Sequence, residues 1–489
     1  MGEILIHLNK RLKMLNVIEQ TWNYKDQIII VLFFIWIIYS GIKNIGQIEN
    51  VNIFAIGGRS FSVFSLWATI SATWISGSSF FITLSGVYFD GLKYYIPSLG
   101  IVLCLLLIAF GIAPFMKKFL GITSVAEAMN LNYGENVRSI TALAGFIGVS
   151  GSIAIQFKIF GQIGQSFFGL DPKLMLIIIS GIIIFYTAFG GVQSVVKTDI
   201  IQLMCFFISL PLVGIIFYYT FKEQNQINFL EIEKFNITKF FYAKDFDLSS
   251  MICLTLYFTI PGLQPSDFQR VCMSISTSQA KYSYLYSALF FLCIKIILLA
   301  FPLGLFAINQ NLEKGQLLTY ILQNFTTFPL LKVVLAIGII SMAMSTADSM
   351  LNIGGVLIAN DFYFFKNFSD YKKLSNTRYC VIALGVMAIA MTFISDDLLS
   401  IILLSNSFYM PIVTPPLLLL IWGFKTTTRC VLIAMGVGFS CVLILKFILG
   451  INFNAIPYAM ALNAIILVTI HYTIEKWELL KHFGIKSKL

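Results

Sequence analysis

Histidine and charged residues are both scarce in this sequence. Only 11% of its 489 residues are charged, and its three histidines, His7, His471 and His482, lie near the ends of the chain. The interior therefore has no histidine for a Ser-His-Asp triad or a zinc site. Carboxylate pairs with acid–base spacing and a Gly-x-x-x-x-Gly-Lys-Ser/Thr phosphate loop are also missing. We therefore expect neither an enzyme nor a protein that hydrolyses ATP.

Cysteine is present but carries no motif. The eight cysteines are scattered, mostly within apolar stretches, and none forms a Cys-x-x-Cys pair. They are best interpreted as small hydrophobic residues, not as a disulfide or metal framework.

Apolar residues, in contrast, dominate the chain. They make up 58% of it, in recurrent runs from Ile28 to Tyr472. Each run is long enough for a bilayer core of about 30 Å, and none alternates as the strands of a membrane barrel do. The composition predicts an all-α polytopic membrane protein. The predicted spans, thirteen in number, are at roughly 28–42, 61–87, 96–115, 140–168, 174–189, 198–220, 249–265, 284–308, 329–358, 377–394, 398–424, 428–450 and 455–473.

The net charge of +10 comes from lysines and arginines in the short loops, not from a nucleic-acid-binding surface. These residues gather on one side of the membrane, and the short loops of the other side hold only Lys93, Lys173 and Lys314. The positive side is cytoplasmic, which puts the N-terminus outside and the C-terminus inside. The basic segment 1–26 fits this arrangement poorly, and we interpret it as a terminal segment, not a signal peptide. The high content of Phe, Ile, Lys and Asn is typical of an AT-rich bacterial genome, so we expect a bacterial inner membrane.

Two of the predicted spans are interrupted. Span two is broken at residues 76–79 (Ser-Gly-Ser-Ser), and span seven at Pro261-Gly262. Each begins a block of five helices, and because five is odd the two blocks enter the membrane from opposite sides. Paired broken helices in matching positions indicate the binding site of a secondary transporter. The expected regions are an N-terminal segment with one peripheral helix (1–60), a first repeat (61–220), an extracytoplasmic loop (221–248), a second repeat (249–424), and two peripheral helices with a short tail (425–489).

A stripe of polar residues lies within one long apolar span. At 100° per residue its members fall on one helix face, and they are Ser341, Ser345, Asp348, Ser349 and Asn352. Polar groups at membrane depth usually face a bundle interior or a water-filled cavity and mark a functional site. The alternative is a contact between helices that small polar residues hold together.

Short motifs between about Gly57 and Phe424 follow the order of a known family. They are Gly57-Gly-Arg-Ser-Phe61, Ser71-Ala-Thr-Trp-Ile-Ser-Gly77, Gly121-Ile-Thr-Ser-Val-Ala-Glu127 with Tyr133-Gly134 and Arg138, Gly190-Gly191 with Thr198-Asp199 and Gln202, Gln269-Arg270, and Met344-Ser-Thr-Ala-Asp-Ser-Met-Leu-Asn352 with Asp361-Phe-Tyr363. In these motifs the chain resembles the sodium:solute symporters, which share the 5+5 inverted-repeat fold of the leucine transporter.

The resemblance implies a sodium site between the first and eighth core helices. Its ligands would be the backbone carbonyls of Ala72, Ile75 and Met342 and the hydroxyls of Ser345 and Thr346. Oxygen ligands suit sodium, which is a hard cation, and an unwound helix frees carbonyls for it.

Two aspartates are not among the implied sodium ligands, but the resemblance suggests related roles for them. Asp199 matches a family aspartate near the cytoplasmic exit and is a possible way-station for sodium, or it caps a helix start. Asp348 either balances charge and holds helices together, or contacts the ion.

The solute would bind between the two broken helices and the third, eighth and tenth core helices. The candidate residues are Trp74, Ser76, Ser78, Ser79, Ser152, Gln156, Gln264, Lys295 and Asn406. Lys295 aligns with a lysine that contacts sugar in a sugar-transporting member. Trp74 departs from the polar residue found in proline and sugar transporters, and the run around it looks more like the pantothenate-transporting branch. Lys158 is a second cation within a span, and snorkelling toward the interface is its alternative explanation.

We therefore predict sodium-coupled symport of a small organic solute, such as an amino acid or a pantothenate-like carboxylate, into the cytoplasm by alternating access. The expected partners are the solute, sodium as coupling ion and the lipid bilayer, with no nucleic acid and no ATP. The alternatives are a transporter-like sensor or receptor without significant flux, a proton-coupled symporter, a membrane-embedded transferase and a passive channel.

Overall fold

The structure is a computed structural model, and it describes residues 24–43, 48, 50–169, 171–224, 231–238, 247–313, 316–317, 320–321, 329–361, 370–393, 398–451 and 455–482. This part of the chain is helical and contains no strand, as predicted. Most of the basic segment 1–26 lies outside the described residues. The helices and helical turns are, in chain order, α2 (Tyr24–Ile42), α3 (Val51–Ile56), η2 (Gly57–Arg59), α4 (Val63–Trp74), α5 (Gly77–Asp90), α6 (Leu92–Ser98), α7 (Gly100–Leu107), η3 (Ile108–Ile112), η4 (Ala113–Phe119), α8 (Val125–Tyr133), α9 (Glu135–Phe168), α10 (Pro172–Gln224), η6 (Glu233–Phe235), α12 (Leu248–Thr259), α13 (Pro265–Cys272), α14 (Thr277–Ile308), α16 (Pro329–Asp361), α17 (Asp370–Met391), α18 (Leu398–Ile421), α19 (Thr428–Leu443), η10 (Ile444–Ile448) and α20 (Ala455–His482).

The predicted count of thirteen spans is not confirmed. Within the described residues, ten helices are long and apolar enough to cross a membrane, or eleven if the bent pair Val51–Arg59 and Val63–Trp74 is one span. One cause is that the spans predicted at 174–189 and 198–220 are the two arms of α10, which count as one continuous helix although its backbone is not helical at Gly191. The other is that the two broken spans are divided into pieces of 8 to 14 residues, at most about 21 Å long at 1.5 Å per residue.

The first break lies slightly earlier than predicted. We expected it at residues 76–79, but α4 ends at Trp74 and α5 begins at Gly77, so only Ile75 and Ser76 are outside the helices. Ser76 explains the difference, because its Oγ accepts a hydrogen bond from Ser79 N at 2.9 Å and caps the start of α5.

The second break lies where Pro261-Gly262 predicted it, between α12 and α13. Side chains of α18 bind the exposed backbone there. Thr414 Oγ1 donates to the Gly262 carbonyl and Tyr409 OH to the Leu263 carbonyl, each at 2.6 Å. A carbonyl without a partner is costly at membrane depth, so these bonds make the break tolerable.

Long helix α10 turns sharply at Gly191. Its backbone there has φ 57° and ψ −174°, and a Cβ at this position would lie 2.9 Å from Ile48 Cδ1. Glycine therefore joins the two arms of α10 without a loop.

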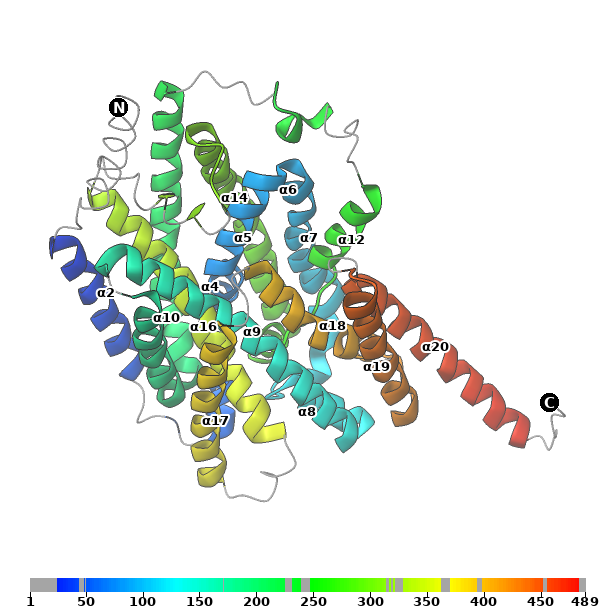
Figure 1. Ribbon diagram of the computed structural model, residues 1–489. Coiled ribbons are helices and arrows are strands. Elements are labelled where there is room, and N and C mark those ends of the chain that lie inside the picture. The colour runs from blue at the N-terminus through cyan, green and yellow to red at the C-terminus, as the bar shows by residue number, and fades with distance from the viewer. Residues whose placement is uncertain are drawn as a thin grey trace.

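Helix α16 lies at the centre of the molecule. It packs against α10, α9 and α17, and 89% of its most apolar window is buried. In Figure 1, α2 and α20 lie at opposite edges of the molecule, with α19 next to α20. The polar stripe predicted for residues 341–352 is thus carried by the most interior helix.

Close packing of α19 on α18 gives a testable prediction. A Cβ at Gly438 would lie 2.2 Å from the backbone oxygen of Pro411, whereas a Cβ at Gly436 would meet nothing within 4 Å. We expect Gly438→Ala to lower the unfolding free energy by about 1–3 kcal/mol through overpacking. Gly436→Ala is the matched control and should be neutral or slightly stabilising, because alanine favours helix. Thermal unfolding of the two purified variants in detergent measures the difference, and equal melting temperatures would contradict the predicted contact.

Candidate functional site

The polar stripe of α16 faces the interior of the bundle. Its five side chains are at most 1% exposed. Partners of these side chains come from α3, α4, α10 and α13. The stripe is therefore the meeting point of several elements, not a contact with one neighbouring helix.

Two hydroxyls of α16 lie against the backbone at the end of α4. Ser345 Oγ is 2.9 Å from the Ala72 carbonyl oxygen and 3.1 Å from that of Met342. Thr346 Oγ1 is 3.2 Å from the carbonyl oxygens of Thr73 and Met342. The carbonyls of Ala72 and Thr73 are available because α4 ends at Trp74, so its last turn has no following N–H groups to bind.

This cluster of oxygens fits a hard cation. Three carbonyls meet two hydroxyls, and each hydroxyl has a single proton, so it cannot donate to both carbonyls near it at once. The surplus of lone pairs in a buried place is what a sodium ion would satisfy. Four of the five predicted ligands come together here, and Thr73 is an oxygen that the sequence comparison missed. Ile75, the fifth, follows α4, and no backbone N–H of the described residues bonds to its carbonyl.

Next to this cluster lies a fully buried ionic centre. Arg270 of α13 is 2% exposed, and its guanidinium lies 3.7 Å from the carboxylate of Asp199 on α10. Thr69 of α4 also donates to Asp199, and Arg270 donates to Ser349 of α16 at 2.6 Å. Asp199 therefore joins helices instead of capping one.

Asp348 is the second carboxylate of this centre. It accepts hydrogen bonds from Tyr186 OH at 2.9 Å and Thr198 Oγ1 at 3.3 Å, both on α10. One oxygen each of Asp199 and Asp348 is buried without a hydrogen-bond partner among the described residues. Arg270 thus pairs with one of the two carboxylates, and both carboxylates have unused acceptor capacity, which favours a further positive charge.

The solute candidates form separate small networks near the breaks. At the first break, Gln156 Nε2 donates to Ser78 Oγ at 3.0 Å, and the hydroxyls of Ser76 and Ser78 are 2.8 Å apart. At the second, Gln264 Nε2 donates to Asn406 Oδ1 at 2.9 Å, and Asn406 in turn donates to Tyr257 OH at 2.8 Å. Tyr257 was not among the predicted residues.

Of the remaining candidates, Ser79 belongs to the first break, where its hydroxyl donates to the Ser76 carbonyl. Ser152 lies farther away, and its one hydrogen bond among the described residues is to the Gly148 carbonyl of its own helix, at 3.4 Å. Lys295 is 1% exposed and donates to Thr83 Oγ1 at 3.0 Å and Ser98 Oγ at 3.3 Å.

Lys158 reaches the carbonyl of Thr392, just beyond the end of α17, at 3.5 Å. A partly buried lysine directed toward a helix end is what snorkelling produces.

A carboxylate that the sequence analysis missed lies between the two breaks. Asp267, in the first turn of α13, is 5% exposed and accepts a hydrogen bond from Trp74 Nε1 at 2.9 Å. This bond brings the end of α4 and the start of α13 together. The signal available in the sequence was an acidic residue only five positions after Gly262, next to the predicted break.

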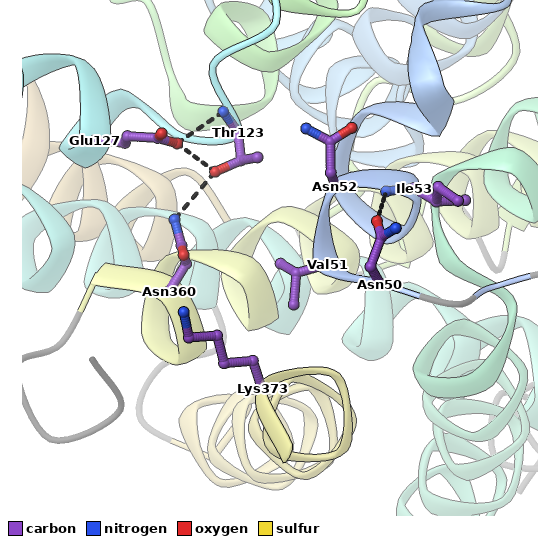
Figure 2. A pocket seen from close by; sticks show the side chains of 8 residues that line it. All are labelled: Asn50, Val51, Asn52, Ile53, Thr123, Glu127, Asn360 and Lys373. Atoms are coloured by element: carbon purple, nitrogen blue, oxygen red, sulfur yellow. Dashed lines mark hydrogen bonds between the residues drawn. The ribbon is translucent and has the colours of Figure 1, made fainter. Parts of the chain in front are cut away.

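Beyond the ionic centre, α3 closes one end of the interior. Gln269 Nε2 donates to the Ala55 carbonyl at 2.6 Å, and Asn352 Nδ2 donates to the Phe54 carbonyl at 3.3 Å. Outside this seal lies a cavity of about 380 Å³ between α3, the loop before α8, and the adjoining ends of α16 and α17. Figure 2 shows Glu127 bonded to Thr123, Asn360 bonded to Thr123, and Lys373 on the opposite wall.

The chain is similar to several known proteins. A model of the sodium:solute symporter family matches residues 54–438. The high-affinity choline transporter 1 of Drosophila melanogaster is 26% identical over 433 residues, which cover 82% of this chain and 67% of that one. A sodium/proline symporter of Staphylococcus aureus (strain Newman) is 27% identical over 209 residues, 40% of each chain. The structure of a sodium-coupled sialic acid symporter matches with a TM-score of 0.79 at 19% identity, covering 92% of this chain and 97% of that chain, which shows a common fold.

Proposed function

The chain belongs to the sodium:solute symporter family, and from this premise we propose that it carries a small organic solute into the cytoplasm together with sodium. It is an integral membrane protein, as its many apolar helices and its family show. We place it in the inner membrane of a bacterium, with the N-terminus outside, on the composition and the loop charges.

The observation that carries the proposal is the oxygen cluster where α16 meets the end of α4. The hydroxyls of Ser345 and Thr346 each lie within 3.2 Å of two carbonyl oxygens. These oxygens belong to Ala72, Thr73 and Met342. Sodium would be held there by these oxygens and by the nearby carbonyl of Ile75. Asp199, buried on the far side of Thr69, would receive the ion on its way to the cytoplasm.

The solute would bind next to the two breaks and apart from the sodium cluster, among Trp74, Gln156, Gln264 and Asn406. These side chains come from α4, α9, α18 and the segment before α13, so a solute there would contact both broken spans and the helices that surround them. The named relatives carry choline, proline and sialic acid, which differ in charge. An amino acid, a pantothenate-like carboxylate and choline are therefore all candidate solutes.

Alternating access requires that one end of the site opens while the other is sealed. In this structure α3 is held to α13 and α16 by Gln269 and Asn352, on the side that the loop charges identify as cytoplasmic. These bonds would break when the solute and sodium leave. Sodium can favour the outward-facing form only by binding it more tightly than the inward-facing form.

Uptake into proteoliposomes tests the proposal. Labelled choline, proline, pantothenate and sialic acid would each be offered with an inward sodium gradient, with potassium in its place, and with an inward proton gradient. We expect uptake of at least one solute that needs the sodium gradient. Uptake that follows the proton gradient alone would favour a proton-coupled symporter, and sodium binding without any uptake would favour a sensor.

A further inference from the structure

The buried charges around the two breaks do not balance. Asp199, Asp267 and Asp348 are at most 5% exposed, and Arg270 is the buried cation among them. Among the described residues three ion pairs are present, and only the one between Arg270 and Asp199 lies at this centre. One bound sodium would offset a single carboxylate of the remaining two. The carboxylate that is then left over either takes up a proton or binds a second positive charge that the solute brings.

We propose that Asp267 binds a positively charged group of the solute, so that the protein selects organic cations such as primary or quaternary ammonium compounds. The inference deepens the proposed function, and it rests on transport occurring between the two breaks. It assigns a residue and a charge class to a site whose solute the family relationship leaves open.

The position of Asp267 supports this assignment. Its carboxylate lies at the start of α13, directly beyond the second break, and Trp74 Nε1 holds one oxygen at 2.9 Å from the end of α4. Among the described residues, Trp74 is the only side chain that donates a hydrogen bond to this carboxylate, and no lysine or arginine nitrogen lies within 4.0 Å of it. The carboxylate is thus fixed in direction and has no lysine or arginine beside it, so a positively charged ligand can pair with it.

The surroundings of Asp267 suit an organic cation. Two aromatic side chains bind to this residue: Trp74 donates to its carboxylate, and Tyr284 OH donates to its backbone carbonyl at 2.9 Å. A carboxylate beside aromatic rings is a common receptor for ammonium groups, which bind to the charge and to the ring faces.

Lys295 does not remove the imbalance. Its ammonium group is bonded to Thr83 on α5 and Ser98 on α6 and makes no ion pair with Asp267. A solute with both charges could use Asp267 for its cationic end and still leave Lys295 for an anionic end.

The test uses the full-length protein in detergent and in proteoliposomes, with probes matched in shape. Choline and ethanolamine are cations, glycine betaine is a zwitterion with the same trimethylammonium group as choline, 3,3-dimethylbutanol is the uncharged isostere of choline, and pantothenate is an anion. In sodium buffer we expect choline or ethanolamine to raise the melting temperature and 3,3-dimethylbutanol and pantothenate to leave it unchanged.

Asp267→Asn is the decisive variant, because an asparagine oxygen can still accept the Trp74 hydrogen bond. It should weaken binding of the cationic probe by about tenfold or more, the usual result of removing one member of a buried charge pair. The sodium concentration for half-maximal effect should change by less than about threefold, since Asp267 is not among the oxygens of the sodium cluster. Asp267→Glu should restore part of the affinity, and Asp247→Asn, at the exposed start of α12, is the matched control.

Two results would contradict the inference: binding of an uncharged or anionic probe in sodium buffer, and no binding of any cationic probe. Neither result would contradict sodium coupling, which the uptake experiment tests separately. If Asp267→Asn weakens sodium binding and not cation binding, the carboxylate serves a second sodium ion and the inference is also wrong. Cation binding that Asp267→Asn removes but sodium does not affect would support the inference and contradict the sodium coupling.

Discussion

Replacing Ser345 and Thr346 together by alanine is expected to abolish sodium-driven uptake. Each hydroxyl lies 2.9–3.2 Å from the carbonyls that we propose as sodium ligands. A bond to a charged group contributes about 1.5–3 kcal/mol, and about 1.4 kcal/mol corresponds to a factor of ten in affinity. Each single variant should therefore raise the half-saturating sodium concentration about tenfold to a hundredfold, and the double variant should bring it beyond the usable range.

The measurement is the sodium dependence of uptake in proteoliposomes, with binding of the solute followed in parallel. Ser150→Ala is the matched control, because Ser150 is equally buried but its hydroxyl bonds, among the described residues, only the Phe146 carbonyl of its own helix, at 2.6 Å. The control should keep the wild-type sodium curve. A double variant with an unchanged sodium curve would show that the ion binds elsewhere.

Arg270→Met is expected to be the most destabilising single change in the interior. Arg270 bonds Ser349 at 2.6 Å and lies 3.7 Å from Asp199, so its removal leaves buried carboxylates without a compensating cation. Breaking a buried ion pair on one side costs about 3–5 kcal/mol, whereas removing both partners is often nearly neutral. We therefore expect a strongly lowered melting temperature for Arg270→Met and partial recovery in Arg270→Met/Asp199→Asn.

Thermal unfolding in detergent compares these variants, with Arg429→Met on the exposed surface of α19 as the control. Recovery in the double variant is the informative result, because it isolates the coupling between the two charges from the loss of packing. Equal destabilisation of the single and double variants would mean that Arg270 acts through packing and its bond to Ser349, not through Asp199.

The membrane class, the two breaks and the polar stripe could all be predicted from the sequence, because each rests on a local pattern. Apolar runs of the length of a bilayer indicate spans, and Pro261-Gly262 interrupts a helix wherever it stands. The stripe from Ser341 to Asn352 follows from the period of the helix. The motifs also pointed to Ala72, Met342, Ser345 and Thr346, which the structure brings together.

Details that depend on capping and on helix length were harder to predict. The first break lies at Ile75 and Ser76, because Ser76 caps α5. The count of thirteen spans is not confirmed, partly because the two arms of α10 meet at Gly191 without a loop between them. Both outcomes depend on one side chain or one backbone angle, which the hydropathy pattern does not resolve.

The sequence by itself determined that this is a helical membrane protein with two interrupted spans, because hydropathy and helix periodicity are properties of neighbouring residues. Only the tertiary structure decided which charges meet. Asp267 lies 193 positions after Trp74, and Arg270 lies 71 positions after Asp199, yet each pair is in contact or nearly so. Such pairings arise from the packing of distant helices. In a buried site of low polarity they determine which charged groups already have a partner before a ligand binds.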